Sequence, residues 1–209
     1  MTTILIADNH EVVRCGLHAL LADRSDWEVV AEAADGKEAV AQASKTTPNV
    51  AIIDYSLPFL NGVEVTKQIR ERSPDTAVLI FTMHDNHFVM RDSLRAGALG
   101  YVLKSDAQRL LVTAIDSVAQ HKSFFAGPAG KAALRASQTK GGSDGPLSAR
   151  ERSVVQLIAE GHSNKKVASI LGVSSKTVET HRATVRDKLD LHSTAALVRY
   201  AVRNNLIEA

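Results

Sequence analysis

Residues 50–54 are Val-Ala-Ile-Ile-Asp, and residues 55–62, which follow directly, are Tyr-Ser-Leu-Pro-Phe-Leu-Asn-Gly. Four apolar residues in a row are typical of a short strand buried on both faces, as in a parallel sheet covered by helices. Because open α/β sheets bind their ligands beyond the carboxyl ends of the strands, Asp54 stands where a functional site is expected. Taken alone, Asp54 is equally well interpreted as a solvated loop acid or a helix cap.

The length and composition indicate an ordinary soluble chain. Its 209 residues are enough for one large or two ordinary domains, and 44% hydrophobic with 23% charged residues is a usual balance. No apolar run approaches the roughly 18 residues that span a bilayer, and the amino terminus enters a strand without a charged and apolar leader. We therefore expect a cytoplasmic protein without a membrane partner.

Cysteine and charge give weaker signals. Cys15 is the single cysteine, which excludes an intrachain disulfide and a cysteine metal cluster. It lies in a helical pattern, so we expect it to pack in the core. Residues 146–209 hold ten Lys/Arg against six Asp/Glu, whereas residues 1–145 hold fifteen against seventeen. A basic excess of this size does not by itself indicate nucleic acid.

Five strand-helix units are predicted in the first 120 residues. The strands are expected at 3–7, 27–33, 50–54, 77–81 and 99–103, and the helices at 12–21, 36–43, 63–72, 86–96 and 107–120. Such an alternation predicts an α/β domain with a five-stranded, doubly wound parallel sheet, because each crossover returns right-handed over the sheet.

Polar residues follow four of these strands at their carboxyl ends. These residues are Asp8, Asn9, Asp54, Thr82 and Lys104. A parallel sheet brings them to one edge, where carboxylate oxygens suit Mg²⁺ and a lysine suits a phosphate oxygen. Any one of them alone is better interpreted as a loop residue, but the joint pattern favours a site for Mg²⁺ and a phosphoryl group.

Residues 1 to about 122 resemble the receiver domain of two-component response regulators, which has a flavodoxin-like fold. The resemblance is carried by Asp8-Asn9-His10, Asp54-x-x-Leu57-Pro58-x-x-x-Gly62, Thr82 and Gly100-Tyr101-Val102-Leu103-Lys104. It implies that a histidine kinase phosphorylates Asp54, with Mg²⁺ surrounded by Asp8, Asp54 and the backbone carbonyl of Ser56. It also implies that Lys104 contacts the phosphoryl group, and that Thr82 swings toward it while Tyr101 changes rotamer.

The sequence departs from the receiver pattern at Asn9, where that family usually has a second acid that ligates the metal. An amide still offers a carbonyl oxygen but removes one negative charge, so weaker Mg²⁺ binding is expected. A regulator that switches without phosphate is therefore the alternative. If an aspartyl phosphate forms, Thr82 and Tyr101 are the candidates for the two-state element that responds to it, with dimerisation as the output. Tyr101 is otherwise interpreted as a partly buried aromatic that does not move.

A linker and a second domain are predicted after residue 122. Residues 123–145 form the linker, because 137–146 contain three glycines, two serines and a proline; a short helix is predicted over 129–136. In residues 146–209, Ser148 and Glu151 have the spacing of a capping box. Three more helices are expected, one capped by Ser163, one by Ser174 or Ser175, and one over 194–204. Four short helices with a glycine-containing turn suggest a helix-turn-helix.

The third of these helices has one apolar and one polar face. Val178, Val185 and Leu189 cluster on the inner face. The opposite face carries small and polar residues, Lys176, Glu179, Thr180, Ala183, Thr184 and Asp187. Such a face fits a major groove about 12 Å wide. Cations at the amino end and along the flanks can contact phosphates. From the pattern alone, a solvated amphipathic helix is an equal alternative.

Residues 146–209 resemble the LuxR-type DNA-binding domain. The motifs are Leu147-Ser148-x-Arg150-Glu151, Ala159-Glu160-Gly161, Ser163-Asn164-Lys165-Lys166-Val167-Ala168 and Ser174-x-Lys176-Thr177-Val178-x-Thr180-His181. With the receiver, they are similar to the NarL/FixJ family of regulators. The resemblance implies a recognition helix from Ser175, binding double-stranded DNA as a homodimer paired through Val198 and Val202. It directs Glu179, Thr180 and Ala183 toward bases, and Lys176, Thr177, Arg182 and Lys188 toward phosphates.

We therefore predict a phosphorylation-controlled transcription regulator that is not an enzyme and that binds paired half-sites as a dimer. Two rivals remain. One is a Mg²⁺-dependent phosphohydrolase or phosphotransferase with Asp54 as covalent nucleophile, although the site offers no further acid or base for turnover. The other is a phosphate-independent regulator, for which Asn9 is the motivating feature.

Overall fold

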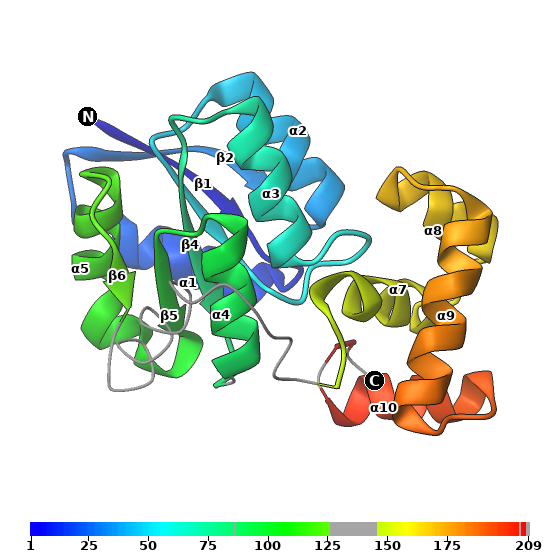
Figure 1. The fold of residues 1–209 in the computed structure, drawn as a ribbon. Helices are drawn as coiled ribbons and strands as arrows, with labels where there is room; N and C mark the ends of the chain where they lie inside the picture. The colour runs from blue at the N-terminus through cyan, green and yellow to red at the C-terminus, as the bar shows by residue number, and fades with distance from the viewer. Residues whose placement is uncertain (86, 126–145, 205, 208–209) are drawn as a thin grey trace. The chain divides into compact units, whose positions relative to one another are not determined.

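The computed structural model describes residues 1–85, 87–125, 146–204 and 206–207 (Figure 1). The chain divides into two compact units, residues 1–140 and 141–209. Most of the predicted linker, including the helix predicted over 129–136, lies outside the described residues. Within the described parts, no helix combines the length and apolar character needed to cross a membrane.

The first unit contains a parallel sheet with the strand order β2-β1-β3-β4-β5-β6. The strands are β1 (Thr2–Ala7), β2 (Trp27–Ala33), β3 (Val50–Ile53), β4 (Ala77–Thr82), β5 (Gly100–Leu103) and β6 (Phe124–Phe125). The five predicted strands are confirmed. The sixth was missed, since residues 123–145 were interpreted as a linker. Two residues are too few to show the alternation of a strand, and β6 is defined only by its pairing with β5 through Gly100 and Tyr101.

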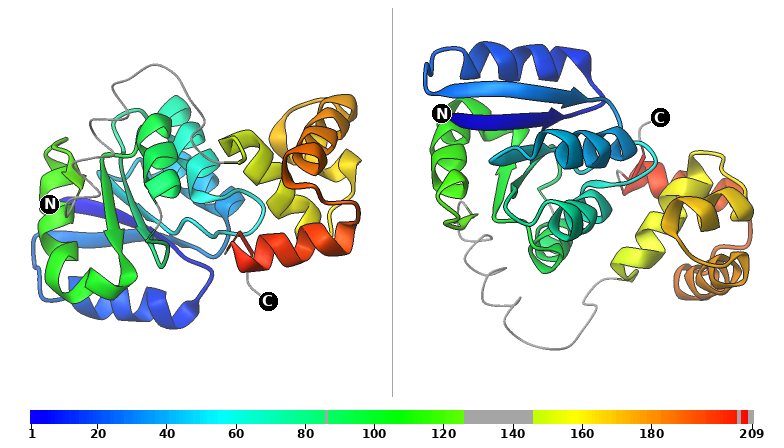
Figure 2. Two further views of the ribbon diagram at one scale, coloured as in Figure 1. Left: turned by 60° about the horizontal axis from the view of Figure 1, so that its bottom comes forward. Right: turned by 90° about the horizontal axis from the view of Figure 1, so that it is seen from above.

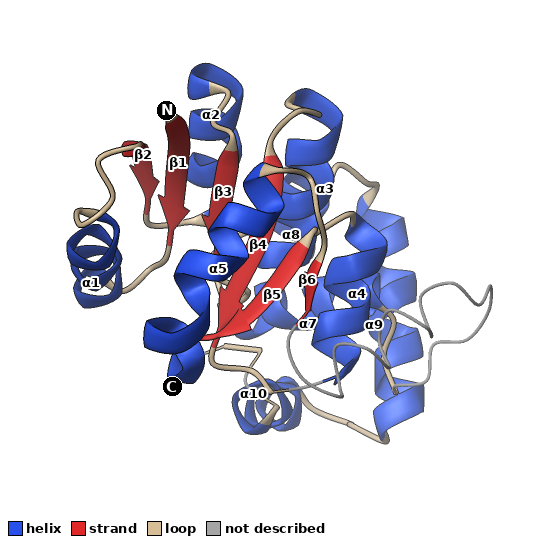
Figure 3. Ribbon diagram, turned by 90° about the vertical axis from the view of Figure 1, so that its left-hand side faces the viewer, coloured by secondary structure: helices blue, strands red, loops and turns tan. Residues whose placement is uncertain are grey.

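Helices cover both faces of this sheet, as predicted (Figures 1 and 3). They are α1 (Glu11–Leu21), α2 (Gly36–Thr46), α3 (Gly62–Arg72), α4 (His87–Ala96), the 3-10 helix η1 (Lys104–Asp106) and α5 (Ala107–Ala119). On one face, Leu17 of α1 and Ile115 of α5 pack against alternate strand residues such as Ile6 and Ile52. The two-residue period of a strand sends the neighbouring residues to the opposite face. Both faces are therefore buried, which explains the continuous apolar runs.

The expectation that Cys15 packs in the core is wrong, because its side chain is exposed. Helix α1 buries Leu17 and Leu21 against the sheet. Two residues along a helix turn the side chain by about 200°, so Cys15 is opposite Leu17. A helical pattern locates a residue in a helix but must be phased on its apolar residues before it predicts burial.

The second unit is all-helical, as predicted (Figure 2). Its helices are α7 (Ala149–Ala159), α8 (Asn164–Leu171), α9 (Ser175–Leu189) and α10 (Thr194–Arg203). Each begins after a serine whose side chain accepts from a backbone amide, namely Ser148, Ser163, Ser174 and Ser193. The predicted capping box is present at the start of α7. Gly172 ends α8 at φ +65°, a conformation that glycine adopts without strain.

Two small cores hold these four helices together. Val178 of α9 is fully buried and packs in a cluster with Leu157 of α7 and Val167 of α8. Val185, 1% exposed, packs in a second cluster with Val155 of α7 and Ala201 of α10. The inner face predicted for α9 is therefore confirmed at both valines. The α8–α9 pair, joined at Gly172, is the helix-turn-helix.

Candidate phosphoacceptor site and nucleic-acid interface

The carboxyl ends of the parallel strands bring three predicted charged residues together. The Lys104 ammonium lies 2.6 Å from Asp8 Oδ2 and 3.4 Å from Asp54 Oδ2. Both carboxylates are buried, with Asp8 1% and Asp54 3% exposed, and Thr82, which ends the neighbouring strand β4, is fully buried. One ammonium therefore faces two buried carboxylates, which leaves the pocket short of positive charge.

Asp54 is a weaker acid than an exposed aspartate. Burial raises the pKa of Asp54 to about 6; the Lys104 ammonium opposes this rise, and the Asp8 carboxylate adds to it. The site thus favours a ligand that brings positive charge to the two carboxylates.

The donor set of the pocket fits Mg²⁺. The backbone amide of His10 donates to Asp8 Oδ1 over 3.0 Å, and the buried Asp8 Oδ2 contacts the Lys104 ammonium. The described residues include no group of three or more His, Cys, Asp or Glu side chains that could hold a metal. Two carboxylates suffice for Mg²⁺, because this ion usually keeps several waters. The adjacent Asn9 has a buried side-chain oxygen, which can add a neutral donor.

The loop between β3 and α3 is held by the start of α2, a contact that the sequence did not reveal. The Gly36 amide donates to the Pro58 carbonyl over 3.1 Å, and a Cβ on Gly36 would lie only 2.0 Å from the Leu60 carbonyl oxygen. Within the same loop, Phe59 has φ +64°, an unfavourable region for a bulky side chain. Such strain persists only where the surroundings enforce it. The packing of Gly36 therefore helps to fix the loop that follows Asp54.

Thr82 and Tyr101 both contact His84, which no sequence pattern had marked. The Tyr101 hydroxyl donates to the His84 carbonyl, and the His84 amide donates to Thr82 Oγ1 over 3.2 Å. The His84 ring lies 2.6 Å from Ser56 Oγ and packs edge-on against Tyr55. Tyr101 is 2% exposed, and burial raises the pKa of its hydroxyl. One residue of the β4–α4 loop thus joins the two predicted switch residues to the loop after Asp54.

The outer face of α9 is polar and exposed to solvent, as the sequence pattern predicted. Lys176, Glu179 and Thr180 are exposed, and Ala183 and Thr184 are half-buried. The Lys176 ammonium lies 3.7 Å from the Glu179 carboxylate, a loose surface ion pair. This face is free of large apolar side chains and can enter a groove.

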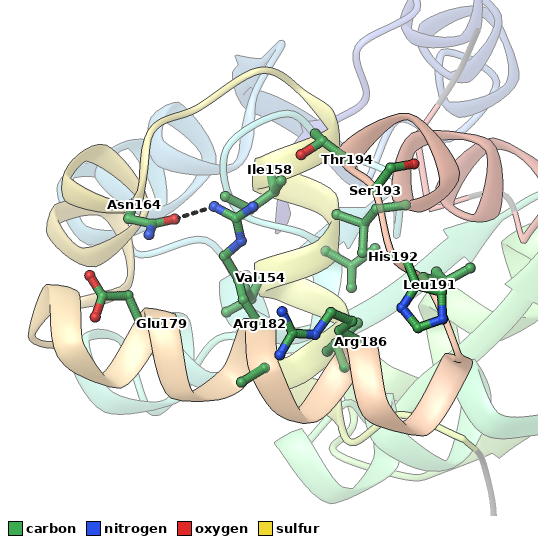
Figure 4. Close-up of a pocket in the computed structure, with 14 residues that line it drawn as sticks. Val154, Ile158, Asn164, Glu179, Arg182, Arg186, Leu191, His192, Ser193 and Thr194 are labelled. Carbon is green, nitrogen blue, oxygen red and sulfur yellow. Dashed lines mark hydrogen bonds between the residues drawn. The ribbon is translucent and has the colours of Figure 1, made fainter.

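A groove of about 330 Å³ runs beside α9 (Figure 4). Arg182 and Arg186 of α9 line it, together with Asn164 of α8 and two residues at the start of α10, its capping Ser193 and Thr194. The Arg182 guanidinium donates to the Asn164 side-chain oxygen over 2.7 Å, which orients it across the groove. The groove therefore presents two guanidinium groups next to the exposed face of α9.

Other predicted residues of this unit are engaged within the fold. The Lys188 ammonium lies 2.9 and 2.8 Å from the two carboxylate oxygens of Glu151, rather than projecting outward as Lys176 does. The Thr177 hydroxyl lies 2.9 Å from Ser174 Oγ at the helix cap. Val198 and Val202 of α10 are half-buried.

Each of the two units matches a known protein family. Residues 4–116 match "Response regulator receiver domain", and residues 145–201 match "Bacterial regulatory proteins, luxR family". The chain is a two-component response regulator with a LuxR-type DNA-binding domain. It is 39% identical to the oxygen regulatory protein NreC of Staphylococcus epidermidis, over 98% of this chain and 99% of that protein.

Further similarities agree with this assignment. The transcriptional regulatory protein MctR of Rhizobium johnstonii is 34% identical over 98% of this chain and 94% of its own length. The structure of RcsB from Salmonella enterica serovar Typhimurium, bound to the promoter rprA with phosphomimetic BeF₃⁻, has a TM-score of 0.71 at 27% identity. That similarity covers 95% of this chain and 97% of RcsB. The response regulator is thus a transcriptional regulator of two domains.

Proposed function

We propose that Asp54 accepts a phosphoryl group from a histidine kinase, and that the adduct changes dimerisation and DNA binding. The supporting observation is the position of the buried Asp54 carboxylate, which shares the Lys104 ammonium with Asp8. An Asp54 oxygen attacks the phosphorus, and the bond from phosphorus to the donor histidine nitrogen breaks. Lys104 lies within reach to bind an oxygen of the transferred group.

Asp8, Asp54 and the Ser56 backbone carbonyl would hold Mg²⁺, with the Asn9 side-chain oxygen as a further donor. When bound, the ion supplies positive charge to the phosphoryl oxygens. Asp8 is suited to this role because its carboxylate is 1% exposed and shares one ammonium with Asp54.

The switch proceeds through His84. A phosphoryl group on Asp54 adds acceptor oxygens beside Thr82, whose hydroxyl now accepts from the His84 amide. When Thr82 swings to donate its hydroxyl to the adduct, its oxygen moves away from the His84 amide, and the β4–α4 loop loses that hydrogen bond. The Tyr101 hydroxyl, bound to the His84 carbonyl, then moves with that loop. A local charge change is thereby converted into a change of the receiver surface.

The property that this switch changes is the affinity of α9 for DNA. Glu179, Thr180 and Ala183 face the bases, whereas Lys176, Thr177 and Arg182 face the phosphates. Val198 and Val202 of α10 form the contact between DNA-bound copies. Support comes from RcsB, a similar protein whose structure is of a promoter complex with a phosphomimetic.

Labelling with acetyl phosphate and Mg²⁺ tests the acceptor. We expect Asp54→Ala to abolish acid-stable, base-labile phosphoprotein, because the attacking oxygen is removed. Asp75→Ala, at an exposed acid, is the matched control and should label as the wild type does. Full labelling of Asp54→Ala would move the acceptor to another residue.

Asn9 favours a second candidate, a regulator that switches without phosphate. Asn9→Asp restores a charge next to Asp8 and should tighten Mg²⁺ binding about tenfold, measured by isothermal titration calorimetry. If labelling of the wild type is undetectable and Asn9→Asp creates it, the second candidate is correct.

A further inference from the structure

The first turn of α7 holds the far end of the recognition helix. Glu151, at the third position of α7, accepts from the Ser148 amide over 2.7 Å and from the Lys188 ammonium over 2.9 and 2.8 Å. Its side chain is 7% exposed, whereas that of Lys188 is 40% exposed. Lys188 lies in the last turn of α9, so the pair ties the start of one helix to the end of the other.

We infer that Lys188 is a positioning residue, which sets the direction of α9 by binding Glu151 instead of contacting a DNA phosphate. This inference rests on the proposed interface between α9 and DNA. It assigns to Glu151, which lies on another helix, an equal part in DNA recognition.

The apolar contacts between α7 and α9 do not by themselves set the direction of α9. Val178 and Val185 are buried against α7 residues, and such packing is not directional. The two short contacts from the Lys188 ammonium attach the end of α9 to one carboxylate on the first turn of α7, which limits how far the two helices can shift against each other. The neighbouring Arg150 donates to the Leu171 carbonyl at the end of α8 over 2.6 Å. The first turn of α7 therefore holds both helices of the helix-turn-helix.

Burial of Glu151 prevents Lys188 from serving two partners equally well. Moving the ammonium to a DNA phosphate would leave a buried carboxylate without its cation, which is strongly unfavourable. Lys176 differs because its carboxylate neighbour, Glu179, is more than half exposed and remains hydrated when the ammonium leaves.

Glu151→Gln separates the two roles by the sign of its effect. If Lys188 contacts a phosphate, removal of the competing carboxylate frees the ammonium and removes a negative charge, so DNA binding tightens. If Lys188 positions α9, the same substitution loosens the helix and DNA binding weakens. The glutamine side-chain oxygen can still accept from the Ser148 amide, so the helix cap is retained.

The experiment uses the full chain and a duplex selected by the wild-type protein from a random-sequence pool. Affinity is measured by fluorescence anisotropy from about 50 to about 200 mM salt. We expect Glu151→Gln and Lys188→Met each to weaken binding about tenfold, and the double variant to bind no more weakly than either. The slope of log affinity against log salt should stay unchanged in all three. Lys188→Arg should bind DNA as the wild type does, because a guanidinium can engage both carboxylate oxygens.

Lys176→Ala is the control for the DNA interface itself, and its salt slope should fall by about one. An unchanged slope and affinity for Lys176→Ala would contradict the proposed interface, independently of Glu151. Tighter binding by Glu151→Gln, or a slope reduced by about one in Lys188→Met, would overturn the positioning role. Circular dichroism gives the folded fraction of each variant. If Glu151→Gln does not fold, the salt slope of Lys188→Met decides the question.

Discussion

The candidate phosphoacceptor pocket and the outer face of α9 are built in opposite ways. The pocket gathers Asp8, Asp54 and Lys104 from the ends of three strands and buries both carboxylates. The α9 face presents neighbouring residues of one helix to solvent, and Lys176 and Thr180 are exposed there. Removing a charge in the pocket should therefore change the stability of the fold. Removing a charge from the outer face of α9 is expected to change DNA binding instead. Substitutions should divide along the same line.

The largest effect is expected for Asp54→Asn in metal-free buffer. The folded pKa of Asp54, about 6, lies above its ordinary value of 3.8, so the ionised carboxylate destabilises the fold above pH 6. This destabilisation is lost as the pH falls through 6 toward 3.8, because the folded state binds the proton more tightly. At pH 7, the asparagine variant should be more stable by about 3 kcal/mol. The difference should disappear near pH 4.

Urea unfolding followed by fluorescence measures this effect in the full chain, because the single tryptophan, Trp27, reports on the receiver alone. Asp75→Asn, at an exposed acid, is the control and should show no comparable pH dependence. Equal stability of wild type and Asp54→Asn at pH 7 would show that Lys104 compensates both carboxylates fully. The proposed electrostatic difference between the pocket and the outer face of α9 would then be wrong.

A smaller effect is expected for Gly36→Ala. This substitution tests whether the pocket depends on the packing of a residue that is distant from Asp54 in the sequence. The added Cβ would meet the Leu60 carbonyl at 2.0 Å, so the loop after Asp54 must move. Overpacking of this kind costs about 2 kcal/mol, and labelling by acetyl phosphate should slow. Gly16→Ala is the matched control and should stabilise α1 slightly, because an added Cβ there would meet no atom of the described residues outside its own helix segment within 4 Å. Normal labelling of a destabilised Gly36→Ala would show that the loop does not position the site.

The smallest effect on stability is expected for Lys176→Ala. Its ion pair is exposed, so the free energy of unfolding should change by less than about 0.5 kcal/mol. DNA affinity should nevertheless fall several-fold, roughly equally for all sequences. Thermal melting and anisotropy on one sample measure both quantities. A change in the preferred base, instead of a uniform loss, would place Lys176 at a base edge.

The fold was largely predictable because its signals are local. Apolar runs located five strands, and serines and glycines marked the helix ends of the second unit. The polar residues at strand ends could be grouped because parallel strands share one edge, and the structure places Lys104 against both carboxylates.

The contacts that were missed join residues far apart in sequence and leave no local pattern. Strand β6 is too short for a periodicity, and it is recognised only through its pairing with β5. Gly36 against Leu60 and His84 between Thr82 and Tyr101 arise only from tertiary packing. A helical wheel describes α9 in isolation, and for that reason it could not reveal that Lys188 is bound to Glu151 of α7.

The most direct test of the central proposal is sedimentation velocity of the wild type and Asp54→Ala, with and without acetyl phosphate and Mg²⁺, alongside DNA binding on the same samples. We predict that the phosphorylated wild type shifts toward dimer and binds DNA more tightly, and that Asp54→Ala shows neither change. Stoichiometric labelling of Asp54 that alters neither self-association nor DNA affinity would contradict the proposal.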